Sequence, residues 1–106
     1  MVTIEWTDEA LTWLEEIHAY IAKENRAAAS RVVQAIYEKV QALRSFPRMG
    51  YVYPNNEGLE VRIVLYGHYR IAYWVQDDTH ITVLGVFHGA LDIQQYLETP
   101  FIKGTS

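Results

Sequence analysis

The chain has no cysteine among its 106 residues, which excludes disulfide bridges and thiolate metal ligands and leaves the redox compartment open. It also has no apolar run approaching the roughly 20 residues that a membrane-spanning helix needs. Basic side chains are scarce, because nine lysines and arginines stand against thirteen acids and give a net charge of −4. This balance disfavours a protein that coats nucleic acid through its overall charge, so any polyanion site has to be a local cluster.

The remaining composition is typical of a folded globular protein, with 50% apolar and 21% charged residues. A length of 106 residues suits one domain, spanning 1–106. The first ten residues, MVTIEWTDEA, lack the basic region and apolar block of a secretory signal. We therefore expect a single-domain cytoplasmic protein without a membrane segment.

The first half of the chain predicts a strand followed by two helices. Residues 2–6 are β-branched and aromatic, as strands are. Thr7 is then expected to cap a helix that runs to about Glu24, and a second helix is expected from about Ala27 to Ser45, where SFPRMG ends it. Because the connection is short, the two helices should form an antiparallel hairpin.

The apolar arc of the first helix is wider than one packing neighbour requires, and it includes Trp13 and Tyr20. Two interpretations stay open for these aromatic side chains. They belong either to the core or to a surface on which a partner chain packs.

The second half predicts three strands, at 59–66, 69–75 and 80–88, after a loop at 51–58. A last segment, 92–98, has the pattern of one or two helical turns. The expected fold is α+β in the order β-αα-βββ-α, with the helical hairpin packed on one face of a mainly antiparallel sheet.

The strand register decides which side chains share a face. We expect odd-length turns at 67–69 and 77–79, because a two-residue Gly-His turn would put Arg70 beside Leu65 among buried leucines. That register places aliphatic and aromatic residues under the helices (Leu59, Val61, Ile63, Leu65, Ile71, Tyr73, Val75, Ile81, Val83 and Phe87). It places Arg62, Arg70, Trp74, Leu84 and His88 on the uncovered face.

Three stretches in this order, SFPRMG, VRIVLYGHYRIAYWV and VLGVFHGALD, make the chain resemble the RelE/ParE superfamily of bacterial and archaeal type II toxins. The resemblance covers essentially the whole chain. It implies a RelE-like fold and a small cytoplasmic toxin that a cognate antitoxin binds and neutralises, forming a hetero-oligomer. RelE-like members cut mRNA on the ribosome, whereas ParE-like members inhibit DNA gyrase by binding it.

Residue by residue, the family's YR arginine matches Arg70. The two lysines that RelE carries on the preceding strand fall near Val61 and Ile63, or near Glu60 and Arg62. GALD replaces the basic residues that follow the last strand, and Tyr96 lies one residue away from the position of the RelE tyrosine. The ending after His88 is more similar to the ParE side.

RNA cleavage of the RelE kind needs a base, an acid and fixed positive charge around one phosphate. A substituted nuclease set would use His88 as base or acid, Arg62 and Arg70 on the phosphate, and Tyr96 as a second proton carrier. The structural alternatives are a strand-end histidine for His88 and an ion pair of Arg70 with Glu60 or Asp92. Trp74 is either partly core or a platform for base stacking and partner contacts.

No histidines and carboxylates have the spacing of metal ligands, and no motif indicates a cofactor. The leading hypothesis is a ParE-like toxin that is not an enzyme and inhibits growth by binding a target, with DNA gyrase first, while an antitoxin holds it inactive. The alternatives are a ribosome-dependent mRNA interferase with a substituted active site, and a decayed, non-toxic relative that acts as a partner-binding module.

Overall fold

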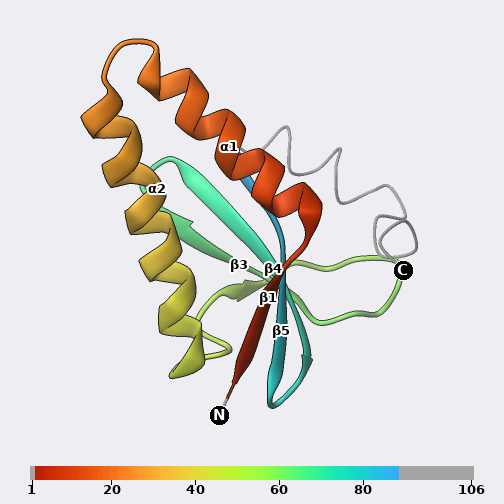
Figure 1. Cartoon of the computed structure of the whole chain (residues 1–106). Helices are drawn as coiled ribbons and strands as arrows, with labels where there is room; N and C mark the ends of the chain where they lie inside the picture. The colour runs from red at the N-terminus through yellow and green to blue at the C-terminus, as the bar shows by residue number, and fades with distance from the viewer. Residues whose placement is uncertain (1, 89–106) are drawn as a thin grey trace.

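The computed structural model describes residues 2–88 and has an α+β fold in which two helices pack on one face of a sheet (Figure 1). The expected helical turns at 92–98 lie outside the described residues. The elements are β1 (Thr3–Trp6), α1 (Asp8–Ala22), α2 (Arg26–Gln41), the short 3-10 helix η1 (Ala42–Arg44), β2 (Tyr51–Val52), β3 (Val61–Tyr66), β4 (Tyr69–Asp77) and β5 (His80–His88). Over residues 2–88 this order confirms the predicted β-αα-βββ part and adds β2, a two-residue strand inside the expected loop.

The sheet has five strands in the order β1-β5-β4-β3-β2. Strand β1 runs parallel to β5, and the other neighbours are antiparallel. The prediction of a mainly antiparallel sheet is therefore confirmed. The crossover from β1 to β5 brings the first strand beside the last, and α1 starts directly where β1 ends.

Both helices begin at side-chain caps. The hydroxyl of Thr7 accepts a hydrogen bond from the backbone N–H of Ala10 at 3.0 Å and donates one to the carbonyl of Val83 at 3.1 Å. Asn25 caps α2 by accepting from the N–H of Ala28 at 2.9 Å. Such caps satisfy the free N–H groups of the first turn. Thr7 also fixes the start of α1 against β5, a contact that its position in the sequence does not predict.

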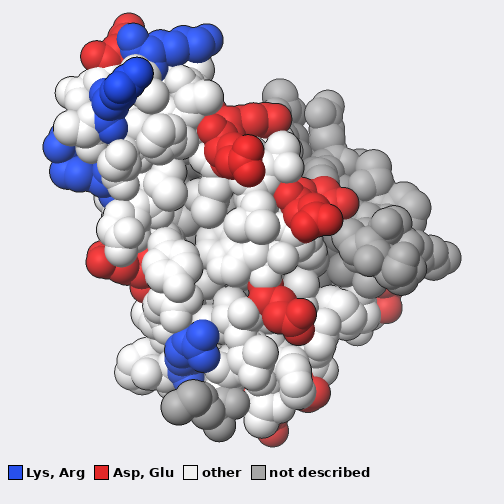
Figure 2. All heavy atoms as spheres, viewed as in Figure 1, with Lys and Arg blue, Asp and Glu red and all other residues white. Residues whose placement is uncertain are grey.

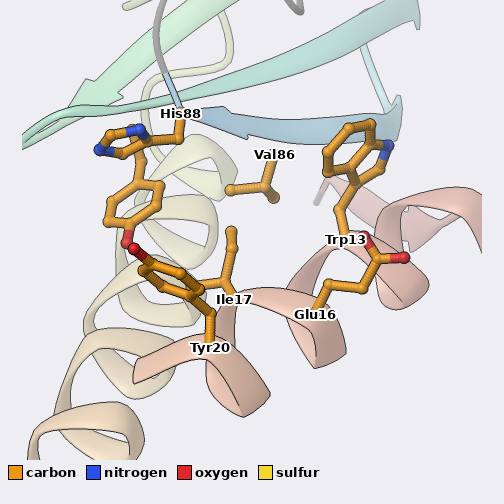
Figure 3. A pocket seen from close by; sticks show the side chains of 7 residues that line it. Trp13, Glu16, Ile17, Tyr20, Val86 and His88 are labelled. Atoms are coloured by element: carbon orange, nitrogen blue, oxygen red, sulfur yellow. The ribbon is translucent and has the colours of Figure 1, made fainter. Parts of the chain in front are cut away.

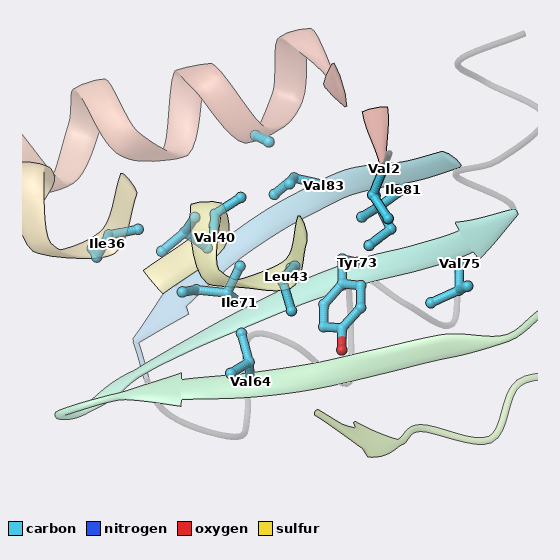
Figure 4. Packing of buried hydrophobic residues seen from close by; sticks show 12 residues of the cluster. Val2, Ile36, Val40, Leu43, Val64, Ile71, Tyr73, Val75, Ile81 and Val83 are labelled. Atoms are coloured by element: carbon cyan, nitrogen blue, oxygen red, sulfur yellow. The ribbon is translucent and has the colours of Figure 1, made fainter. Parts of the chain in front are cut away.

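The main core lies between the helices and the sheet (Figure 4). We call this side of the sheet the helix-side face. Its fully or nearly buried apolar residues come from both layers: Val2, Ala10, Ile36, Val40, Leu43, Val64, Ile71, Tyr73, Val75, Ile81, Val83 and Val86. From α1, Trp13, Leu14 and Ile17 pack against this cluster, whereas Leu11 and Tyr20 remain 44% and 75% exposed. The wide apolar arc of α1 is thus only partly used by the core.

A second apolar cluster lies on the opposite side of the sheet, which we call the far face. It consists of Val61, Ile63, Ala72, Leu84 and Phe87, with Trp13, Tyr53, Leu59 and Trp74 packed against it. Because both faces of the central strands are apolar, the alternation of polar and apolar residues that identifies a one-sided sheet is weak here.

The predicted turn lengths were wrong. Both turns are two-residue turns, at 67–68 and 78–79, and Gly67 supplies the positive φ (56°) that the first one needs. Leu65 therefore pairs with Arg70 across β3 and β4. The expected cost of burying Arg70 among leucines does not arise in this register, because Leu65 lies on the far face and is 49% exposed.

This register corrects several face assignments. Val61 and Ile63 lie in the far-face cluster and not under the helices. Arg62 pairs with Tyr73 and shares the helix-side face. Ile71, Tyr73, Val75, Ile81 and Val83 do lie under the helices, as predicted.

A bulge in β5 corrects two further face assignments, those of Phe87 and His88. The partners of β4 step from Ala72–Gly85 to Tyr73–Val83, so Leu84 is the extra residue of a bulge. A bulge shifts the phase of alternation by one residue. Phe87 consequently lies in the far-face cluster, and His88, paired with Tyr69, lies on the helix-side face.

Within residues 2–88, no helix combines the length and apolar character needed to cross a membrane.

The turn between β4 and β5 predicts a specific pH dependence of stability. The carboxylate of Asp77 accepts hydrogen bonds from the backbone N–H of Thr79 at 2.8 Å and its hydroxyl at 2.9 Å, and lies 3.0 Å from Nδ1 of His80. These contacts, the backbone one first, lower the pKa of Asp77 from 3.8 to about 2. Because the folded pKa is the lower one, this stabilisation is complete above about pH 4 and is lost as the pH falls toward 2.

Asp77→Asn should therefore flatten the stability curve between pH 5 and pH 2, measured as urea midpoints by circular dichroism. Asp78→Asn, which changes the neighbouring exposed carboxylate, should retain the slope of the parent. Parallel curves for parent and Asp77→Asn would contradict the assignment.

Candidate functional site

Arg62, Arg70 and His88, which were expected on one face of the sheet, lie on two different faces. Arg62 and His88 lie on the helix-side face, at opposite ends of the sheet, and Arg70 lies on the far face. The expectation that they form one working surface was wrong, for the two reasons given by the turn lengths and the bulge. Tyr96 lies outside the described residues.

Arg62 is held by the loop that precedes β2. Its Nε donates to Glu60 at 2.8 Å, and its Nη1 donates to the carbonyls of Gly50 at 2.7 Å and Arg48 at 3.2 Å. Glu60 also accepts from Nε of Arg48 at 2.9 Å, and Arg48 contacts Asp78 at 3.2 Å. Hydrogen bonds from Arg48 and then Arg62 lower the pKa of Glu60. The side chain of Arg62 is only 18% exposed, so it is committed to this network.

Arg70 lies partly exposed on the far face, between its cross-strand partners Leu65 and Phe87. Within residues 2–88, the structure gives its guanidinium no ion pair or hydrogen bond, and the considered partner Glu60 is taken by Arg48 and Arg62. Asp92, the other considered partner, lies outside the described residues. Trp74 shares this face and packs partly buried against the far-face cluster.

His88 is exposed and stands at the end of β5 beside other rings. Its ring centroid lies 5.2 Å from that of Tyr69 and 6.1 Å from that of His68. Burial, and secondly the neighbouring phenol of Tyr20, raise the pKa of Tyr69. His88 is therefore part of an aromatic group shared by the β3–β4 turn, β4 and β5.

This group forms one wall of a hollow of about 370 Å³ between α1 and the ends of β4 and β5 (Figure 3). Ile17 and Val86 lie in its middle, Trp13 and Glu16 on one side, and Tyr20 and His88 on the other. Tyr69 completes the lining. The structure thus brings Trp13, Tyr20 and His88 together, three residues that the sequence analysis had singled out for different reasons.

A second hollow, of about 520 Å³, continues along α1 and shares Trp13 and Glu16 with the first. Asp8, Glu9 and Thr12 complete its lining. We call the two hollows together the α1 groove. Among residues 2–88, no lysine or arginine lines either hollow. Figure 2 shows acidic side chains over α1, whereas most of the Lys and Arg side chains visible in this view lie toward the α1–α2 connection.

Sequence reasoning missed Glu16 and Tyr69. Glu16 is a charged residue outside the apolar arc of α1, but it lies three residues from Trp13 and four from Tyr20, the spacing at which helical side chains are neighbours. Tyr69 joins the site only through tertiary packing. In the described part of the chain, no group of three or more histidines and carboxylates is placed to hold a metal ion.

Two helices packed on one face of a mixed five-strand sheet define the fold class of this chain. The architecture is that of the RelE/ParE-like fold. It is similar to a solved chain described as the chromosomal ParDE TA system from P. aeruginosa, with a TM-score of 0.66 and 22% identity over 85% of this chain and 98% of that chain.

Residues 4–93 match the model of the ParE toxin of type II toxin-antitoxin system, parDE, and the chain therefore belongs to the ParE toxin family. The protein "Putative toxin Y4kP" of Sinorhizobium fredii (strain NBRC 101917 / NGR234) is 49% identical over 47 residues. That match spans 44% of this chain and 49% of the relative, so it covers about half the length of each.

Proposed function

We propose that this ParE-family toxin acts in the cytoplasm by binding a macromolecular target, DNA gyrase, and that a cognate antitoxin neutralises it in a hetero-oligomeric complex. The observation that carries the binding mode is the dispersal of the basic and titratable residues. An RNA-cleaving site requires positive charge, a base and an acid around one phosphate. Here Arg62 is bound to Glu60 and two loop carbonyls, and Arg70 lies on the other face from His88.

The surface left for binding is of two kinds. On the far face, Arg70 is a cation without a bonded partner among residues 2–88 and lies beside the exposed Leu65. Along α1, Trp13 and Tyr20 present aromatic area in the α1 groove. Interfaces are commonly built around such arginine and aromatic anchors. We assign the far face around Arg70 and Trp74 to the target and the α1 groove to the antitoxin.

The proposal predicts inhibition of supercoiling without RNA cleavage. Purified toxin added to DNA gyrase and relaxed plasmid should abolish supercoiling when the toxin is in excess. Primer extension on mRNA from cells expressing the toxin should show no new 5′ ends. Arg70→Ala should weaken the inhibition about tenfold or more, because an interfacial arginine anchor is removed. Arg48→Ala, which removes an exposed arginine of the loop before β2, should retain it.

The second candidate function is an mRNA interferase. His88 favours it, because its ring lies beside those of Tyr69 and His68, and the same experiment tests it. New cleavage sites inside codons, lost in His88→Ala or Arg70→Ala, would overturn the binding mode in favour of this enzyme. Harmless expression of folded protein that affects neither supercoiling nor mRNA would indicate the non-toxic, partner-binding relative.

A further inference from the structure

We propose that the α1 groove binds a basic segment of the antitoxin, with one arginine or lysine side chain seated between Trp13 and Tyr20 beside the carboxylate of Glu16. This inference rests on the proposed function, since it names the chemistry of the antitoxin segment that the groove accepts.

The shape of the hollow suits a side chain with an apolar stem and a polar end. Ile17 and Val86 form its apolar middle, and the rings of Trp13 and Tyr20 stand on either side (Figure 3). A volume of about 370 Å³ lies at the small end of the range of roughly 300–1,000 Å³ in which ligand pockets fall. The methylene stem of an arginine or lysine can pack on such apolar ground while its charged end reaches the rim.

The described part of the chain gives the rim only one sign of fixed side-chain charge. Asp8, Glu9 and Glu16 line the α1 groove, and none of the lysines and arginines in that part does. An acidic segment or a nucleic-acid phosphate would meet three carboxylates there, whereas a basic segment meets complementary charge. This argues for a cationic protein segment and against a polyanion as occupant.

The aromatic residues add a second reason for a cation. Tyr20 is 75% exposed although it belongs to the apolar arc of α1, and with Trp13 and Tyr69 it surrounds the hollow. Aromatic faces attract guanidinium and ammonium groups. The Nζ of Lys23 already lies 6.0 Å from the centroid of the Tyr20 ring, so one face of this ring has a cation within range in the free protein.

The length of the groove favours a polypeptide segment over a small molecule. Its lining runs from Asp8 to Tyr20 along α1, and the twelve steps between these residues span roughly 18 Å at 1.5 Å per residue. About three turns of a partner helix fit along this distance, which is the helix-in-groove mode of recognition.

The test uses the full chain and three synthetic helical peptides of leucine and alanine that differ at one central position, with Arg, Gln or Glu. Binding is measured by fluorescence anisotropy and located by the NMR shifts of the Trp13 indole and the Val86 methyl groups. The arginine peptide should bind at least about tenfold more tightly than the glutamate peptide. Glu16→Gln should weaken it by about tenfold, the loss expected for one charge-assisted hydrogen bond.

Glu15→Gln is the matched control, because it makes the same change on an exposed residue of α1 that lines neither hollow. Equal binding of the three peptides, equal effects of the two glutamine variants, or shifts at other residues would overturn the proposal. Self-association of the chain that Glu16→Arg abolishes would do the same, since the occupant would then be a second copy. Failure of the proposed function would appear separately, in the supercoiling assay, which contains no peptide.

Discussion

Replacing Phe87 with alanine is expected to lower the free energy of unfolding by about 4 kcal/mol, the cost typical of a phenylalanine removed from a core. The side chain is fully buried in the far-face cluster, and its ring centroid lies 5.0 Å from that of Trp13 in an edge-on contact. A Cβ on Gly85 would lie 2.5 Å from the ring, so Gly85 makes room for it. The measurement is urea unfolding followed by circular dichroism.

Two further variants test the physical reason. Phe87→Leu keeps most of the apolar volume and should cost about 1.5 kcal/mol. Leu65→Ala, on the same face but 49% exposed, should cost less than about 1 kcal/mol. If Phe87→Ala were no more destabilising than Leu65→Ala, the far-face cluster would not be a second core.

What the sequence predicts correctly is local. The cap at Thr7, the two helices and the approximate ranges of β3 to β5 depend on neighbouring residues, and the structure confirms the Thr7 cap and the order of elements within residues 2–88. The strand faces depend instead on a turn one residue shorter than expected and on one extra residue at Leu84. A single-residue shift moves every later side chain to the opposite face.

The placement of Arg62 failed for a different reason. Strand alternation put it on the uncovered face, opposite to Val61 and Ile63. Its partners are Glu60 and the carbonyls of Arg48 and Gly50, which a loop brings to the end of the helix-side face. Spacing along one strand shows the nearby Glu60 but cannot show two carbonyls twelve and fourteen residues away.

The candidate site was predictable only on its helical side. Trp13 and Tyr20 stand out in the sequence because they widen the apolar arc of α1 beyond what one neighbour requires. Tyr69, Val86 and His88 join them from strands nearly 50 residues or more further along the chain. The phase shift at Leu84 turns Val86 and His88 toward α1, and no alternation pattern predicts that orientation.

Replacing Gly50 with alanine is expected to cost about 3 kcal/mol, the upper part of the range for overpacking a well-filled site. A Cβ at this position would lie 2.6 Å from the carbonyl oxygen of Ile63 and 2.9 Å from the hydroxyl of Tyr73. The first of these is a backbone atom of β3, where Ile63 pairs with Tyr51 of β2, so it cannot rotate away. The φ of Gly50 is not positive, and the expected cost is therefore steric and not conformational.

Two hydrogen bonds also hold Gly50 in place, which limits how far its backbone can shift. Its N–H donates to the hydroxyl of Tyr73 at 3.0 Å, and its carbonyl accepts from Arg62 at 2.7 Å. Tyr73→Phe removes hydrogen bonds without adding volume and should cost only about 1–2 kcal/mol. Gly58→Asn is the control, because Gly58 has positive φ, which asparagine tolerates, and open space around its Cβ position. A higher urea midpoint for Gly50→Ala than for Tyr73→Phe would mean that the loop moves aside, and Arg62 would then be freer to bind a ligand than its contacts indicate.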